Sequence, residues 1–139
     1  MKITICGSMT FATKLVDIHN TLKKMGHEPL VHGNLFGVAD GTAEEVSRYG
    51  SEHHEVKKKY DYIRAWHKLI VSGDAILVCN FDKKGIKNYI GGNTLMEMGF
   101  AHVSGKKIFL LNAVPDIGYK DEILAMRPVV IDGDLKKIT

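Results

Sequence analysis

The chain has 139 residues, of which 45% are hydrophobic and 25% are charged, as is typical of one globular domain with its own core. Its formal net charge of +3 is small, and its basic residues are scattered apart from a run at 57–59, which we interpret as a solvated helix face rather than part of a nucleic-acid-binding surface. No apolar run approaches the roughly 18 residues of a membrane span, and we expect the first residues to form a strand rather than a signal peptide.

The first half of the chain predicts two strands and two helical regions. Residues 3–6 predict a strand that ends at a glycine, and apolar residues at helical spacing predict a helix over 11–25. Residues 29–32 predict a second strand, and 33–41 predict a loop. A long polar helical pattern, with one break inside it, then covers 42–72.

The second half continues the alternation. Residues 75–79 are all apolar, which is typical of a strand buried on both faces of a parallel sheet. A glycine turn at 91–92 opens a further helix. After it the pattern predicts a strand over 108–111, a short helix over 121–125 and a last strand over 129–131.

The alternation of strands and helices predicts the fold. Strand–helix–strand units imply right-handed crossovers and a parallel sheet with helices on both faces. Five strands favour a doubly wound α/β fold of order 2-1-3-4-5, so we expect a single domain over residues 1–139. Ligands of such sheets bind beyond the carboxyl ends of the first and third strands, which here continue into the loops 7–10 and 80–93.

Glu97 is the most informative residue of the chain. It stands among apolar residues in the early turns of the helix after the glycine turn, and it has no cationic helical neighbour among Asn93, Thr94, Phe100 and Ala101. A carboxylate in such a setting is rarely kept unless it is solvated at an edge or has a chemical role. The backbone N–H groups at the start of the same helix suit an anionic ligand. The segment therefore predicts a carboxylate next to an anion site.

The loop 7–10 after the first strand has two interpretations. Ser8 or Thr10 caps the following helix, or the same N–H groups bind an anion, and the two roles are compatible. The chain contains no G-x-G-x-x-G fingerprint, no Walker loop and no G-x-S-x-G elbow. The loop also suits flavin binding of the flavodoxin type, although it is poor in hydroxyl side chains.

The histidines and cysteines predict neither a metal site nor a disulfide framework. None of the seven histidines shows metal-ligand spacing, so we expect no metal and no cofactor. His67 shares a predicted helical face with Ile63 and Ile70, which favours a partly buried side chain over a catalytic one. Cys6 and Cys79 fit two small buried residues in a reduced, cytoplasmic protein.

The segment 91–101, read with Ile5-Cys6-Gly7-Ser8 and residues 72–78, resembles the nucleoside 2-deoxyribosyltransferase superfamily. This superfamily includes the 2′-deoxynucleoside 5′-monophosphate N-glycosidases. Its members carry a small-residue turn, then a nucleophilic Glu followed by Gly-aromatic-Ala, and the matching residues here are Thr94, Glu97, Gly99, Phe100 and Ala101. The turn Cys6-Gly7-Ser8 looks more like the monophosphate branch, in which this loop helps to hold a 5′-phosphate.

The resemblance implies covalent glycosyl catalysis on a small-molecule nucleoside or nucleotide. Glu97, kept ionised near a helix N-terminus, would attack the anomeric carbon and displace the base, and water or a second base would open the intermediate. The implied substrate-binding residues are Cys6, Gly7, Ser8, Met9, Gly91, Gly92, Asn93 and Thr94. The resemblance also implies a homo-oligomer, most simply a dimer. Tyr62 and Trp66, one turn apart on a polar helix, either bury at a subunit contact or pack on the sheet.

Two positions depart from the family pattern. The transferases have an Asp six residues before the Glu, where this chain has Gly91, and a catalytic Asp eight residues before the position of Asp74, where this chain has Trp66. We expect either that His67 or Asp61 protonates the departing base, with imidazole suited because it titrates near neutral pH, or that transfer activity is weak or lost. The missing Asp favours a second hypothesis, a non-catalytic nucleotide-binding module of the same fold that senses a nucleotide or sugar-nucleotide, whereas the retained Glu97 opposes it.

Overall fold

The computed structural model describes residues 1–42 and 61–139. Five strands form one parallel sheet in the order β2-β1-β3-β4-β5, which confirms the predicted fold class and strand order. The strands are β1 (Lys2–Cys6), β2 (Glu28–Leu30), β3 (Ala75–Val78), β4 (Lys107–Leu110) and β5 (Val129–Val130). The predicted strands therefore all form, with boundaries shifted by one or two residues.

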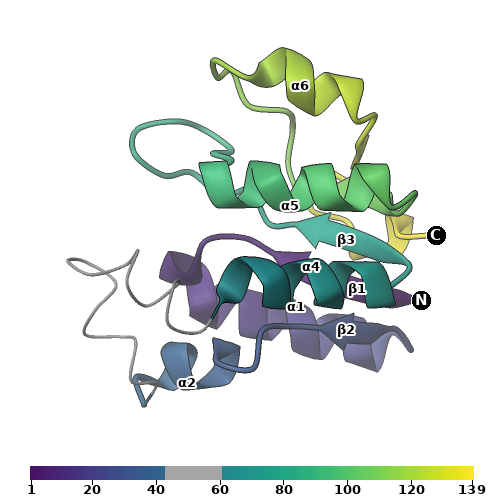
Figure 1. The fold of residues 1–139 in the computed structure, drawn as a ribbon. Helices are drawn as coiled ribbons and strands as arrows, with labels where there is room; N and C mark the ends of the chain where they lie inside the picture. The colour runs from purple at the N-terminus through teal and green to yellow at the C-terminus, as the bar shows by residue number, and fades with distance from the viewer. Residues whose placement is uncertain (43–60) are drawn as a thin grey trace.

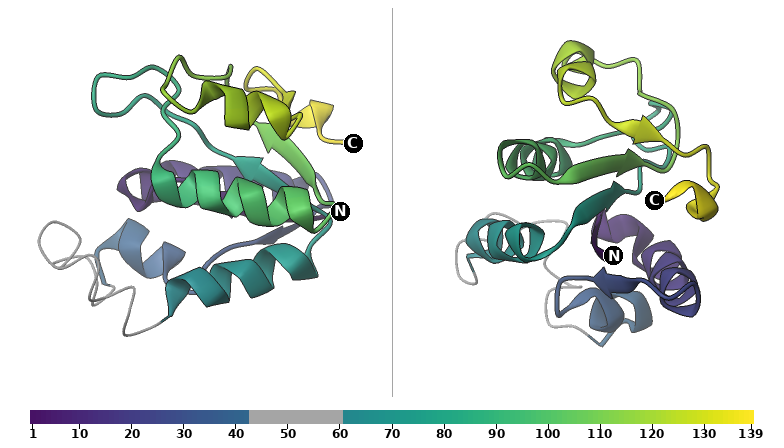
Figure 2. Two further views of the ribbon diagram at one scale, coloured as in Figure 1. Left: turned by 45° about the horizontal axis from the view of Figure 1, so that its top comes forward. Right: turned by 90° about the vertical axis from the view of Figure 1, so that its right-hand side faces the viewer.

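Helices cover both faces of the sheet (Figure 2). They are η1 (Met9–Phe11), α1 (Ala12–Lys24), α2 (Leu35–Asp40), α4 (Tyr62–Ser72), α5 (Gly92–Val103), α6 (Lys120–Ala125) and η3 (Leu135–Lys137). One apolar core packs α1 and α2 against the sheet, and a second packs α4, α5 and α6 against the opposite face. Within the described residues, no helix is long and apolar enough to cross a membrane.

The central strand β3 explains why the sheet has two cores. Ala75 and Leu77 belong to the first core, whereas Ile76 and Val78 belong to the second. All four side chains are fully buried. Because successive side chains of a strand point to opposite faces, a strand between two helix layers needs apolar residues at every position. This requirement explains the continuous apolar run of β3, from which the strand could be predicted.

One predicted segment differs from the structure, and another lies partly outside the described residues. The loop predicted over 33–41 is wrong, because α2 forms there, buries Leu35 against α1 and ends at Gly41, whose φ of 80° supplies a left-handed helix end. Its six residues are too few to show an amphipathic pattern. The helical region predicted over 42–72 is described only from residue 61, where α4 begins, so the basic run at 57–59 lies outside the described residues.

The sheet brings the loops after β1 and β3 together. The backbone N–H of Cys79 donates to the carbonyl of Cys6 at 2.8 Å, so the two strands are still paired where they end. These ends and the first turn of α5 lie at the end of the molecule away from the N and C termini (Figure 1). The strand order reverses between β1 and β3, which is where doubly wound sheets bind ligands.

Candidate active site

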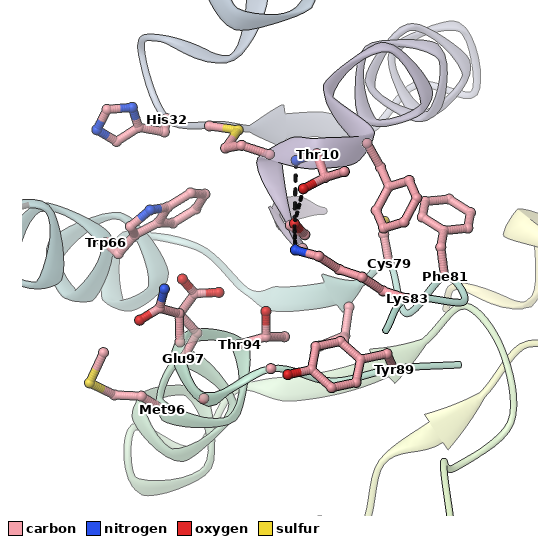
Figure 3. Close-up of a pocket in the computed structure, with 18 of the residues that line it drawn as sticks. Thr10, His32, Trp66, Cys79, Phe81, Lys83, Tyr89, Thr94, Met96 and Glu97 are labelled. Atoms are coloured by element: carbon pink, nitrogen blue, oxygen red, sulfur yellow. Dashed lines mark hydrogen bonds between the residues drawn. The ribbon is translucent and has the colours of Figure 1, made fainter. Parts of the chain in front are cut away.

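A cavity of about 530 Å³ opens at the carboxyl ends of β1 and β3 (Figure 3). Its wall is built by the turn after β1, by His32 and Val38 on the β2 side, by the first turns of α4, and by residues between 78 and 100. This volume lies within the range of small-molecule sites, and the position is the one predicted from the strand order.

Most of the predicted site residues meet at this cavity. Glu97 lines it, as do seven of the eight predicted substrate-binding residues: Gly7, Ser8, Met9, Gly91, Gly92, Asn93 and Thr94. The eighth, Cys6, is fully buried in β1 and is not part of the wall. The two loops predicted to hold a ligand are therefore brought together, and Cys6 lies behind them.

Glu97 is the one acidic side chain among the described residues of the wall. It is 7% exposed, and Figure 3 shows its carboxylate reaching into the cavity between Trp66 and Thr94. The helix that carries it begins after Gly91, so its free backbone N–H groups also face this end of the sheet. The carboxylate is thus largely shielded from solvent, at a position where a ligand inside the cavity would contact it.

The buried Cys6 thiol is the neighbour of the Glu97 carboxylate on the side away from the cavity. Burial raises the pKa of the Cys6 thiol well above its ordinary value, and the adjacent Glu97 carboxylate raises this pKa further by its charge and by accepting a hydrogen bond. The thiol therefore stays protonated at neutral pH and has one proton to donate, either to the Thr4 carbonyl at 3.9 Å or to the Glu97 carboxylate. The role predicted for Cys6 changes accordingly, from contact with a substrate to contact with the carboxylate.

The turn after β1 needs glycine at its first position. A Cβ atom on Gly7 would lie 3.2 Å from the carbonyl oxygen of Cys79 and 3.4 Å from its Cβ, which is tighter than ordinary contact. At Gly92 the situation is the opposite, because a Cβ there would meet no described atom within 4 Å. Gly7 thus lets the turn pack against β3, and Gly92 leaves open space at the start of α5.

Asn80, which the sequence reasoning missed, fixes the loop that follows β3. It is 1% exposed. Its Oδ1 accepts from the Asn112 backbone N–H at 2.9 Å, while its Nδ2 donates to the carbonyls of Asn112 and Ala113 at 3.2 and 3.0 Å. In return, Asn112 Nδ2 donates to the Asn80 carbonyl at 3.0 Å. The sequence signal was one polar residue at the end of an otherwise apolar strand.

Aromatic side chains form the wall beside Glu97. The His32 ring lies 4.4 Å from the Tyr62 ring and 5.8 Å from the Trp66 ring, measured between centroids. The Tyr62 hydroxyl accepts from Asn34 Nδ2 at 2.8 Å, which ties α4 to the segment after β2. Tyr62 and Trp66 therefore line the cavity, and their rings offer a surface suited to a flat ligand ring. Sequence reasoning did not identify His32.

Lysines approach the cavity from the loop after β3. Lys83 and Lys84 both line it, and Lys83 Nζ donates to Ser8 Oγ at 2.7 Å. Figure 3 shows Lys83 and Glu97 entering the cavity from different sides. The cavity consequently has the Glu97 carboxylate beside Trp66, the Lys83 ammonium beside the turn after β1, and the Lys84 ammonium 5.6 Å from the centre of the Tyr89 ring.

The structure does not bring His67 to the cavity. The residue is exposed, so the expectation of a partly buried histidine is wrong, and its ring meets the edge of Phe100 at a centroid distance of 5.1 Å. Successive residues of an α-helix point in directions that differ by 100°, so Trp66 lines the cavity while the side chain of His67 points away from it. Asp61, the other candidate acid, instead caps α4 and pairs with Arg64 at 3.0 Å.

Among the residues that the structure describes, no group of three or more histidine, cysteine or acidic side chains is placed to hold a metal ion. Comparisons of the chain with protein-family models, with curated proteins and with solved structures found no match.

Proposed function

We propose that this protein cleaves, or transfers a group at, the N-glycosidic bond of a nucleoside or its 5′-monophosphate through a covalent intermediate on Glu97. The observation that carries the proposal is the buried Glu97 carboxylate, which projects into a cavity at the switch point of the sheet. Aromatic rings on one side of this carboxylate suit a nucleobase, and lysines on the other side suit an anionic sugar substituent.

The chemistry proceeds in two displacements at the anomeric carbon. A Glu97 carboxylate oxygen forms a bond to this carbon while the bond to the base nitrogen breaks, and the base leaves with the electron pair and takes a proton from water. Water, which gives up a proton to the solvent, or a second base then attacks the same carbon from the opposite face, and the bond from this carbon to the Glu97 oxygen breaks. Hydrolysis and transfer differ only in this second nucleophile.

A second candidate is a nucleotide-binding module that performs no chemistry. The observation that favours it is the absence of a second carboxylate among the described residues of the wall, because a leaving base usually needs a positioned acid. The module would use the same cavity, bind the same class of ligand and leave it intact.

The assay that separates the candidates also tests substrate choice. We expect free base to appear when the protein is incubated with 2′-deoxynucleoside 5′-monophosphates. The kcat/KM for these substrates should be at least about tenfold higher than for the unphosphorylated nucleosides, because each charge-assisted hydrogen bond to the phosphate contributes about 1.5–3 kcal/mol. Chromatography of the bases measures both rates. Equal or better use of nucleosides would contradict the preference, and binding without base release would favour the sensing module.

His67 is expected to matter little for this reaction. Because its side chain lies outside the cavity, His67→Ala should change the rate of base release by less than about threefold, whereas loss of a general acid would slow it by about 10²–10⁴-fold. Rate and melting temperature are measured on the same variant. A stable protein with a hundredfold slower reaction would restore His67 as the acid.

We also propose that the protein forms a homodimer. Tyr62, Ile63 and Trp66 line the cavity and give this proposal no support, but Val71 and Val103 are 41% and 81% exposed on the neighbouring helices α4 and α5. A second copy covering these side chains would remove them from water. Light scattering at micromolar concentration should give the mass of two chains, and the mass of one chain would refute the proposal.

The cysteines support a reducing compartment. Cys6 and Cys79 are both free and buried. Free thiols are usual in the cytoplasm and uncommon in secreted proteins. We infer a cytoplasmic location, which a tagged copy of the protein would test by fractionation of the cell.

A further inference from the structure

The loop after β3 is a small hairpin that presents two lysines in a fixed direction. The backbone groups of Lys83 and Ile86 exchange hydrogen bonds of 3.1 and 2.9 Å, and the two residues between them, Lys84 and Gly85, have φ values of 54° and 71°. Two left-handed residues make the tight turn that joins paired strands most readily. A non-glycine residue rarely adopts this conformation, and such strain often accompanies a functional role.

Lys83 extends from this hairpin to the turn after β1, 75 positions earlier in the chain. Its ammonium donates to Ser8 Oγ at 2.7 Å. The same oxygen accepts from the Thr10 backbone N–H at 3.3 Å and donates to Thr10 Oγ1 at 3.0 Å. A hydroxyl group has one donor and two acceptor sites, so the Ser8 side chain has no hydrogen-bonding capacity left for a ligand.

The Lys83 ammonium, in contrast, keeps unused capacity. It has three N–H donors, and Ser8 is its one hydrogen-bond partner among residues 1–42 and 61–139. No carboxylate in the described part of the chain lies within ion-pair distance of it. Lys83 is thus a half-buried cation in the wall of a cavity, held by a neutral group.

The electrostatic setting of Lys83 also favours an anionic ligand. Partial burial lowers the pKa of the Lys83 ammonium, and the charge of neighbouring Lys84 lowers this pKa further. A bound anion would offset both effects by giving the two cations a common counter-charge. Among the described wall residues, the one acidic side chain is Glu97, which enters the cavity from a different side.

We propose that Lys83 is the specificity-determining residue of this site: its ammonium, positioned by Ser8 and supported by Lys84, binds the 5′-phosphate of the substrate. This inference rests on the proposed function for the identity of the ligand. It changes the role expected for Ser8, which positions Lys83 instead of contacting the phosphate with its hydroxyl. It also places the anion on the side of the cavity opposite His32 and Trp66 (Figure 3).

The kinetic test compares a monophosphate with its own nucleoside. The ratio of their kcat/KM values should fall at least about tenfold in Lys83→Gln, mainly through KM, since one charge-assisted contact is lost. Lys83→Arg keeps the charge and should restore most of the ratio. Lys87→Gln is the matched control, because Lys87 is exposed on the same loop and does not line the cavity, and its ratio should equal that of the unchanged protein.

Direct binding separates this inference from the proposed reaction. Titration calorimetry with inorganic phosphate should show binding to the unchanged protein and to Lys87→Gln, and at least about tenfold weaker binding to Lys83→Gln. If no base is released but this pattern of phosphate binding appears, the proposed reaction is refuted and the anion site is supported. If base is released but folded Lys83→Gln keeps the full monophosphate preference, the reaction stands and the role of Lys83 is overturned. Melting curves verify that each variant is folded.

Discussion

Glu97→Gln should lose base release by about 10³-fold or more and remain folded, because the amide keeps the shape of the side chain and removes the nucleophile. Glu97 is 7% exposed, so its replacement is buried in the same place. The amide oxygen can still accept the hydrogen bond that the Cys6 thiol offers. Loss of activity without loss of structure is therefore the expected signature.

The control for this variant is Glu122→Gln, an exposed carboxylate in the first turn of α6. It removes the same charge at a side chain that does not line the cavity and should leave turnover unchanged. Mass spectrometry of the unchanged protein, quenched during reaction, should find a sugar adduct on the peptide that contains Glu97. Full turnover by Glu97→Ala would show that the mechanism is wrong.

The fold was predictable because its signals are local. Continuous apolar runs such as Ala75–Val78 identify buried strands, and their alternation with helical patterns sets the sheet order. Glu97 was predictable for the same reason, since its unusual setting is visible within two helical turns. The short helix α2 was missed because its formation depends on Leu35 packing against α1, a tertiary contact.

The remaining wall residues depend on contacts between distant segments. Lys83 and Ser8 are 75 residues apart, and Asn34 and Tyr62 are 28 residues apart. No periodicity or motif links these pairs, so the loops could be predicted from the sequence but the contacts between their side chains could not. His67 is next to Trp66 in the chain, but only Trp66 lines the cavity, because adjacent residues on a helix point in directions that differ by 100°.

Asn80→Ala should lower the free energy of unfolding by about 2–3 kcal/mol, more than a typical surface change. The methyl group leaves the Asn112 backbone N–H without its acceptor and removes two donors from the carbonyls of Asn112 and Ala113. Each lost bond contributes about 1 kcal/mol, and a half-buried N–H without a partner costs more than an exposed one. Ala113 is exposed, so water replaces part of the loss there.

Asn80→Ala should lower activity by more than the loss of folded protein alone would explain. The loop that Asn80 anchors carries Phe81, Lys83 and Tyr89 of the cavity wall, and its far end is held by the Tyr119 hydroxyl, which donates to the Ile90 carbonyl. With one anchor gone, Lys83 should bind an anion less tightly even in folded molecules, so KM for a monophosphate should rise at temperatures well below melting.

Asn20→Ala, an exposed change on α1, is the control, and its free energy of unfolding should stay within about 0.5 kcal/mol of that of the unchanged protein. Urea unfolding and steady-state kinetics on both variants test the argument. If Asn80→Ala is as stable as Asn20→Ala, the hydrogen bonds of Asn80 do not hold the site together.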